Sequence, residues 1–201
     1  MGEPIGFLRG AITMSKHDKL SVFISLILRH SPQTINMKLD ESGYANVDEL
    51  IQGINNSGRY IDLAILQEIV DQDKKKRYSF NDTKTLIRAN QGHSVHVNVP
   101  LRTVTPPAYL FHGTAIHSLQ SILTHGIKKM DRLYVHLSDT IETAFQVGKR
   151  HGKVVIIKID ALRMHEDGYL FLVSENDVWL TDYIPVQYII NLSDLMEEKL
   201  I

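Results

Sequence analysis

An arginine and a histidine stand side by side at positions 29 and 30, immediately before Ser31-Pro32. A guanidinium keeps its charge and donates hydrogen bonds from a rigid fork, and an imidazole can exchange a proton near neutral pH. Arg29 and His30 together could therefore hold an anion such as a phosphate. The simpler alternative is structural, because the helix dipole also favours a cation at a helix C-terminus.

A second group of candidate residues begins with a cluster of cations. The stretch from Lys74 to Arg88 contains one acid, Asp82, and six basic residues: Lys74, Lys75, Lys76, Arg77, Lys84 and Arg88. A polar segment with several hydrogen-bonding groups follows: Gln91, Gly92, His93 and Ser94. Local positive charge is typical of a surface that binds a phosphate backbone, although a lysine run also occurs on plain solvated surfaces.

The motif His112-Gly113-Thr114 lies between a strand-like segment and a helix-like segment. A ligand loop is one interpretation, since glycine lets a ligand approach closely and the flanking side chains can form hydrogen bonds with it. The other interpretation is a plain strand-to-helix turn in which Thr114 is the N-cap.

Two further motifs combine histidine with a cation. Arg132 lies just before the strand-like segment 134–138, which contains His136 and Ser138, and Arg150-His151 lies just before a glycine. Both motifs could contact a ligand. Their structural alternatives are that Ser138 caps the next helix and that Arg150-His151 is the basic end of a helix.

The sequence lacks the residues that several common chemistries need. It contains no cysteine, which excludes disulfides, thiolate metal sites and a cysteine nucleophile. No helix carries two histidines with a glutamate at metal-binding spacing, so we expect no metal. Glycine-rich motifs of the Rossmann and P-loop types and the serine elbow of hydrolases are also missing.

Length and composition describe an ordinary folded protein. The length of 201 residues is enough for one large or two small domains, and a hydrophobic fraction of 43% is enough to form a core. With 22 basic and 23 acidic residues, the formal net charge is −1, so the whole-chain charge does not indicate a nucleic-acid binder. No apolar run reaches the roughly 18–20 residues of a membrane span, and we expect a cytoplasmic protein without membrane association.

Periodicity in the first half predicts three helices followed by a hairpin. Apolar residues recur at helical spacing in a first helix from Ser15, a second from Asn46 and a third over 62–72. Residues 77–80 and 85–88 then predict two strands around a four-residue turn. Three helices followed by a two-stranded wing is the winged-helix order, which we assign to residues 15–98. Residues 1–14 form an extension outside it.

The second half alternates short strands and helices. Prolines and weak periodicity over 97–108 indicate a linker. Beyond it we expect a second domain over 107–201, with strands near 109–111, 134–137, 154–157, 169–173 and 178–180 and helices over 115–125 and from Ser138 to about Val147. The sequence therefore predicts an α+β protein of two lobes.

The motifs, taken in order, resemble those of the tRNA (RNA) 2′-phosphotransferase family. The residues that carry this resemblance extend from about Lys16 to Ile190 and comprise Leu28-Arg29-His30, Lys76-Arg77-Tyr78, the run from Arg88 to Ser94, His112-Gly113-Thr114, Val135-His136-Leu137-Ser138 and Gly148-Lys149-Arg150-His151-Gly152. The resemblance implies an N-terminal winged-helix RNA lobe. It also implies a C-terminal lobe with the split β-sheet and helices of ADP-ribosyltransferases, which binds NAD.

The resemblance also implies a reaction and residue roles. An internal RNA 2′-phosphate would attack the ribose of the co-substrate NAD and expel nicotinamide, and ADP-ribose cyclic phosphate would then leave. The implied catalytic residues are Arg29, His30, Arg77 and Arg132. The implied NAD-binding residues are His112, Gly113, Thr114, His136, Ser138, Arg150 and His151, and the implied RNA-binding residues are Lys76, Arg88, Gln91, Gly92, His93 and Ser94. Val178 stands where many ADP-ribosyltransferases have a catalytic glutamate.

Two other functions stay open at this point. One is an ADP-ribosyltransferase that modifies nucleic-acid ends or a protein and stops after the first step. The other is a non-catalytic winged-helix protein that binds nucleic acid and senses an effector. The full set of Arg29, His30, Arg77 and Arg132 favours the phosphotransferase, since a sensor does not need it, and we expect the enzyme to be a monomer.

Overall fold

The structure is a computed structural model that describes residues 15–190. The chain folds into helices and several small antiparallel sheets, which confirms the α+β class. The predicted extension 1–14 and the last residues of the predicted second domain, 191–201, lie outside the described residues.

The three helices predicted in the first half are confirmed. They are α1 (Lys16–Arg29), α2 (Val47–Asn56) and α3 (Leu63–Asp71), and their side-chain caps are Ser15, Asn46 and Asp62. Ser15 and Asp18 form a reciprocal capping box, with both hydrogen bonds at 3.0 Å. The apolar stripe of α1 is buried as its spacing predicts: Leu20, Phe23, Ile24, Ile27 and Leu28.

The predicted wing has three strands rather than two. The hairpin strands β2 (Tyr78–Phe80) and β3 (Leu86–Ala89) pair as expected, and β1 (Tyr44–Asn46) adds to the other edge of β3. Strand β1 was not predicted from the sequence, because three residues are too few to show a period of two. The extra strand places Tyr44 opposite Arg88.

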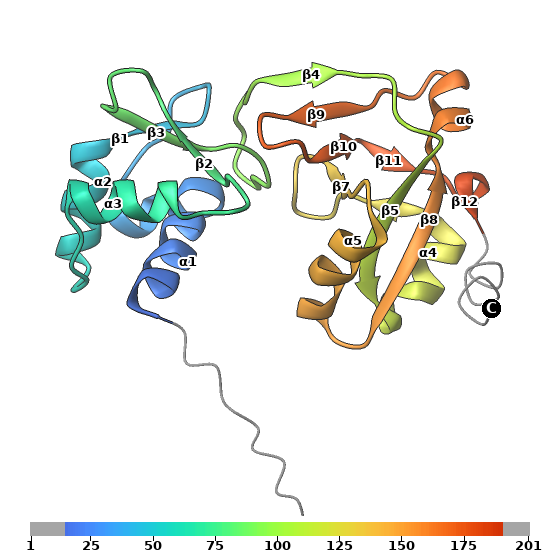
Figure 1. Ribbon diagram of the computed structural model, residues 1–201, viewed down its shortest axis with the longest axis horizontal. Helices are drawn as coiled ribbons and strands as arrows, with labels where there is room; N and C mark the ends of the chain where they lie inside the picture. Colours follow the sequence, from blue (N-terminus) through green and yellow to red (C-terminus); the bar gives the residue numbers. More distant parts are fainter. Residues whose placement is uncertain (1–14, 191–201) are drawn as a thin grey trace, which may run out of the picture.

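The predicted linker over 97–108 is wrong in part, because it contains a strand. β4 (Leu101–Thr103) pairs with β9 (Leu172–Ser174), and the sheet continues through β10 (Trp179–Thr181) to β7 (Val135–Leu137). The flanking prolines suit an edge strand, where a missing N–H donor costs little. Figure 1 shows β4 along the top of the molecule, directly above β9.

The motif His112-Gly113-Thr114 is not a strand-to-helix turn. It lies inside β5 (Tyr109–Ala115), which pairs with β8 (Val154–Asp160) along its whole length, while β12 (Ile189–Ile190) covers the other edge of β8. Thr114 is therefore no helix cap. The helix expected from Ala115 begins later, as η2 (Ile116–Ser118) followed by α4 (Leu119–His125).

Ser138 is also no helix cap. Helix α5 (Ile141–Gly148) is capped by Thr140, and Ser138 exchanges two backbone hydrogen bonds of 2.8 Å with Phe111. The basic end after α5 is confirmed as the short 3-10 turn η3 (Lys149–His151), which stops at Gly152. The remaining elements are η1 (Pro32–Ile35), β6 (Ile127–Lys128), α6 (Ala161–Glu166), β11 (Tyr183–Ile184) and η4 (Val186–Tyr188).

Buried apolar residues gather in two clusters. One involves residues between Leu20 and Ala89, and the other involves residues between Leu110 and Tyr188. In Figure 1 the elements of the first cluster lie on the left, and α5 lies on the side of the second cluster that faces them. No helix within residues 15–190 is long and apolar enough to cross a membrane.

Candidate active site

The end of α1 carries the first two candidate residues, as predicted. Arg29 is the last helical residue, and His30 caps the helix by donating its backbone N–H to the Leu26 carbonyl at 2.9 Å. The segment after β3 returns to this point. Ser94 donates its backbone N–H to the Arg29 carbonyl at 2.9 Å, and its hydroxyl lies 3.0 Å from His30 Nδ1. The structure thus joins two motifs that are far apart in the sequence.

The Arg29 guanidinium lacks protein partners on one side. Its Nε and Nη2 atoms are buried without a hydrogen-bond acceptor among the described residues. Burial, together with the positive charges of Arg77 and Arg132, lowers the pKa of Arg29 to about 10. A buried donor without an acceptor is costly, so this cluster is suited to receiving an anion.

Arg77 is held by an acid that precedes the lysine run. Asp73 accepts the Arg77 backbone N–H at 2.7 Å and pairs with Arg77 Nη1 at 2.5 Å. Asn90 completes this arrangement, because its side chain donates to the Lys76 carbonyl at 2.8 Å and its backbone N–H donates to the Arg77 carbonyl at 2.9 Å. The position of Arg77 is therefore determined by backbone contacts as well as by one ion pair.

Arg132 reaches this group from the C-terminal half. The next residue, Leu133, donates its backbone N–H to the His93 carbonyl at 3.1 Å, which ties the Arg132 segment to the segment that contacts Arg29. Partial burial lowers the pKa of Arg132, and the charge of Arg150 lowers it further. Positive charge from both halves thus converges without a matching number of acids.

His30 lies within the field of these cations. Burial lowers its pKa first, followed by the charges of Arg29 and Arg132. A neutral imidazole can donate from one ring nitrogen and accept at the other. With Nδ1 next to the Ser94 hydroxyl, the Nε2 atom is the one left for a ligand or a proton transfer.

His112 and His136 form a chain that leads back to the N-terminal half. His112 Nδ1 lies 3.0 Å from the His136 carbonyl, so a proton on Nδ1 leaves Nε2 as the free nitrogen of the His112 ring. His136 Nε2 lies 2.9 Å from the Gln91 amide, and His136 Nδ1 lies 3.0 Å from the Tyr134 carbonyl. Burial and then the charge of Arg132 lower the pKa of His136 to about 3.

The neutral His136 ring can donate to only one of its two neighbours. Both neighbours are acceptors as placed, the Tyr134 carbonyl beside Nδ1 and the Gln91 Oε1 atom beside Nε2. Donation from Nδ1 to the Tyr134 carbonyl makes Nε2 an acceptor, so the Gln91 amide forms a hydrogen bond there when it is turned to present its NH₂ group. Gln91 was predicted to contact RNA and His136 to contact NAD. Their contact shows that the two predicted groups of residues meet.

Gly113 has a packing role that the motif did not reveal. A Cβ on this residue would lie 1.7 Å from the Ala144 carbonyl oxygen of α5, and a Cβ on Gly148 would lie 2.9 Å from the Gly113 carbonyl carbon. The two glycines let α5 lie directly on β5. The absence of a Gly113 side chain is thus required by the helix, whatever binds nearby.

The other predicted residues occupy different surroundings. Thr114 and Ser138 are half-buried, whereas Arg150 and His151 are exposed in η3. His93 is 2% exposed, and its Nε2 has no partner among the described residues. Gly92 has a φ of +87°, and the space beside its Cα is occupied by the Arg29 side chain at 3.6–3.7 Å.

Arg88 lies between the two halves rather than on an open surface. Its side chain is 7% exposed, donates from Nη2 to Glu175 at 2.8 Å and stacks over the Tyr44 ring at 4.6 Å. Its role toward RNA stays a prediction.

Four residues that contact the candidate residues or the backbone beside them were not predicted from the sequence: Asp73, Asn90, Glu175 and Asn176. The spacing of Asp73 and Arg77, four residues apart, was a usable signal for an ion pair. Glu175 and Asn176 gave no such signal, because their partners lie in the first half of the chain. Among residues 15–190, no three His, Asp or Glu side chains gather in a way that could hold a metal ion.

Comparison with known proteins defines the class to which this fold and this site belong. Residues 15–183 match the family described as RNA 2′-phosphotransferase, Tpt1 / KptA family. The match covers nearly all of the described chain and every candidate residue. The chain therefore belongs to this family.

Individual relatives agree with the family match. The chain is 56% identical over 177 residues to a probable RNA 2′-phosphotransferase of Fusobacterium nucleatum, an alignment that covers 88% of this chain and 99% of the relative. It is 46% identical over 170 residues to a protein of the same description from Flavobacterium johnsoniae, with 85% and 93% covered. A third such protein, from Acaryochloris marina, is 45% identical over 173 residues, with 86% and 96% covered.

Proposed function

We propose that this protein removes an internal 2′-phosphate from RNA by transferring it to NAD. The 2′-phosphate attacks the anomeric carbon of the NAD ribose and nicotinamide leaves, which gives an ADP-ribosylated RNA phosphate. The adjacent ribose hydroxyl then attacks phosphorus, RNA leaves with a 2′-hydroxyl, and the second product is ADP-ribose 1″,2″-cyclic phosphate. The reaction would need no metal, and the enzyme would act as a cytoplasmic monomer.

The observation that carries this proposal is the group of arginines around Arg29. The buried Nε and Nη2 atoms of Arg29 have no acceptor among the described residues, and the charges of Arg77 and Arg132 act on the same guanidinium. A phosphate can accept hydrogen bonds from several guanidinium groups at once. We assign the RNA 2′-phosphate to this position.

The chemistry suits arginine rather than a strong base. The nucleophile of the first step is already an anion, so the main requirement is to place it against the ribose carbon. In the second step negative charge gathers at phosphorus, where Arg29, Arg77 and Arg132 would stabilise it. His30, with Nδ1 beside Ser94, is suited to orienting the phosphate or to giving a proton to the departing RNA hydroxyl.

Residues of the C-terminal half would hold NAD. The Nδ1 atom of His112 faces a carbonyl, so Nε2 is left to accept a hydrogen bond from a ligand. The Arg150 charge that acts on Arg132 is suited to a pyrophosphate. We propose that the remaining contacts with NAD are made by the predicted residues Gly113, Thr114, His136, Ser138 and His151. Gly113 would contact NAD through its backbone, since it has no side chain.

The RNA strand would lie along the N-terminal half. Lys76, Gln91, Gly92, His93 and Ser94 belong to segments that touch Arg29, Arg77 or His136. We accordingly propose a winged-helix RNA lobe over 15–98 and an ADP-ribosyltransferase-like lobe over 107–201. The two hydrophobic clusters support this division, since one lies within each range.

A single incubation tests the function. The protein is mixed with an RNA that carries one internal 2′-phosphate, with and without NAD, and the products are followed by mass spectrometry. Loss of phosphate only with NAD, together with ADP-ribose cyclic phosphate, is the expected result. A stable ADP-ribosylated RNA would indicate an enzyme that stops after the first step, and unchanged RNA with intact NAD would indicate a binding protein. An RNA with a 2′-hydroxyl at the same position is the matched control.

A further inference from the structure

The turn between β9 and β10 is built around one buried serine. Ser174 is fully buried, accepts the Val178 backbone N–H at 3.1 Å and donates from its hydroxyl to the side-chain oxygen of Asn176 at 2.8 Å. The amide of Asn176 therefore has a defined orientation, with its oxygen toward Ser174 and its NH₂ group directed away from the turn.

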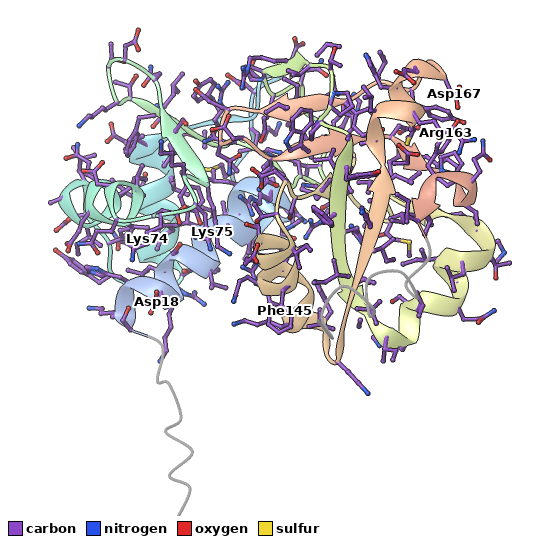
Figure 2. The ribbon with its side chains drawn as sticks, turned by 45° about the vertical axis from the view of Figure 1, so that its right-hand side comes forward. Asp18, Lys74, Lys75, Phe145, Arg163 and Asp167 are labelled. Carbon is purple, nitrogen blue, oxygen red and sulfur yellow. The ribbon has the colours of Figure 1, made fainter. Side chains whose placement is uncertain are left out.

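The NH₂ group of Asn176 reaches the other half of the molecule. It donates to the Lys75 backbone carbonyl at 2.9 Å, across 101 positions of the sequence. Figure 2 labels Lys75 on the side of the N-terminal half that faces the C-terminal half, next to Lys74. The contact is thus made at the junction and not at a remote surface.

Lys75 belongs to a short backbone segment in which every carbonyl is held. The carbonyls of Lys75, Lys76 and Arg77 accept hydrogen bonds from the Asn176 side chain, the Asn90 side chain and the Asn90 backbone N–H. Two of these three donors come from the N-terminal half itself. Among residues 15–190, only the Asn176 amide forms a hydrogen bond between this segment and the C-terminal half, which carries Arg132.

The segment also contains a conformation that needs support. Lys76 has a φ of +44°, in the left-handed region that a lysine seldom occupies. Hydrogen bonds to the carbonyls on either side of this residue hold the strained backbone in place. The direction of Arg77, the next residue, depends on that backbone.

We infer that Asn176 is a positioning residue of this enzyme, which holds the Lys75–Arg77 backbone so that Arg77 meets the phosphate opposite Arg132. This inference rests on the proposed function for the identity of the reaction. Asn176 does not itself touch the reacting groups. It acts through the Lys75 carbonyl, and nothing in its residue type alone would assign it a role.

The test uses three variants of Asn176 in the full chain. Asn176→Asp keeps the size and the contact with Ser174 but places a second acceptor against the Lys75 carbonyl, and Asn176→Leu removes the donor without adding charge. Asn176→Gln retains an amide donor. The matched control is Asp177→Asn, which changes the exposed neighbour that pairs at 3.3 Å with Arg102 on the surface.

We expect Asn176→Asp and Asn176→Leu to lower kcat about 10-fold, with KM for RNA and for NAD changed less than about 2-fold, because small displacements of a catalytic group lower the rate of chemistry more than binding. The kcat of Asn176→Gln should lie within about 3-fold of that of the unaltered protein. The kcat of Asp177→Asn should equal that of the unaltered protein. Loss of activity in Asp177→Asn equal to that of Asn176→Asp would overturn the inference.

A double-mutant cycle separates positioning from a general effect. In an Arg77→Lys background, Asn176→Asp should cause less than about a 2-fold further loss, because both changes act on the same side chain. A full additional 10-fold loss would show that Asn176 does not act through Arg77. Hydrogen exchange of the Lys76 and Arg77 amides, followed by NMR, should be faster in Asn176→Asp even without substrate. If the unaltered protein shows no activity toward RNA, faster exchange still supports the contact, while the proposed function alone fails.

Discussion

Arg88 and Glu175 form an ion pair of 2.8 Å between the two halves of the molecule, although 87 positions separate them in the sequence. Only 7% of the Arg88 side chain is exposed, whereas Glu175 is 49% exposed. The buried arginine thus depends on a carboxylate that arrives from the other half. Together with the Asn176 contact to Lys75, this pair joins the β9–β10 turn to the strands that carry the cationic site.

Removing the charge of Glu175 should destabilise the protein. We expect Glu175→Gln to lower the free energy of unfolding by about 1–2 kcal/mol, because it weakens a charge-assisted hydrogen bond to a buried cation. Asp177→Asn removes the same charge from the surface pair with Arg102 and should cost less than about 1 kcal/mol. Urea denaturation of both variants measures the difference. Equal losses of unfolding free energy would show that the Arg88–Glu175 pair stabilises the protein no more than the surface pair does.

Arg132 should be needed for chemistry more than for RNA binding. We expect Arg132→Ala to lower the rate of phosphate removal by about 10²–10³, or about 3–4 kcal/mol, since it removes one donor to developing negative charge. Binding of 2′-phosphorylated RNA, measured by fluorescence anisotropy, should change only slightly. Arg163→Ala is the control, because Figure 2 shows Arg163 in the C-terminal half, far from Lys75. Undiminished phosphate removal by Arg132→Ala would contradict its role.

Gly113 should not tolerate a side chain. A Cβ at 1.7 Å from the Ala144 carbonyl oxygen cannot be accommodated unless α5 moves away from β5. We expect Gly113→Ala to lower the free energy of unfolding by about 3 kcal/mol or more. Gly58→Asn is the comparison: no atom of the described residues lies within 4 Å of its Cβ position, and asparagine accepts its positive φ. Thermal unfolding of the two variants should therefore differ clearly.

The buried histidines should make the fold sensitive to acid. Burial, aided by the charge of Arg29, lowers the pKa of His93 from 6.5 to about 4. Below pH 6.5 the unfolded chain therefore binds a proton that the folded protein does not. The contribution of His93 to the free energy of unfolding is therefore complete above pH 6.5. As the pH falls from 6.5 toward 4, the free energy of unfolding decreases by up to about 3 kcal/mol because of this residue.

The slope of the unfolding free energy against pH shows whether His93 causes this pH dependence. Urea denaturation between pH 7 and pH 4 should show a smaller decrease in unfolding free energy for His93→Gln than for the unaltered protein. His96→Gln changes an exposed histidine nearby and should leave the decrease as it is. Identical slopes for all three proteins would contradict the prediction. His136, with its pKa lowered to about 3, acts in the same direction and should account for part of the remainder.

Local features of the fold could be predicted from the sequence. Ser15, Asn46 and Asp62 cap the first three helices where the pattern placed them, because a cap and an apolar stripe depend only on residues a few positions apart. The family was recognised in the same way, since its motifs are short and occur in a fixed order.

Long-range pairing could not be predicted in this way. β4 lies in a segment interpreted as a linker, and His112-Gly113-Thr114 lies inside β5, because strand formation depends on distant partners such as β9 and β8. Ser138 is bonded to Phe111 for the same reason.

The sequence by itself determined which side chains are available for chemistry and where the first three helices begin. Only the tertiary structure decided which of these side chains meet: Ser94 with His30, Gln91 with His136, and Asn176 with the Lys75 backbone. The physical reason is that caps and helical stripes are contacts within one or two turns of chain. The candidate site is instead formed by contacts between segments 45 to 101 positions apart, and these contacts exist only when both halves are folded and packed together.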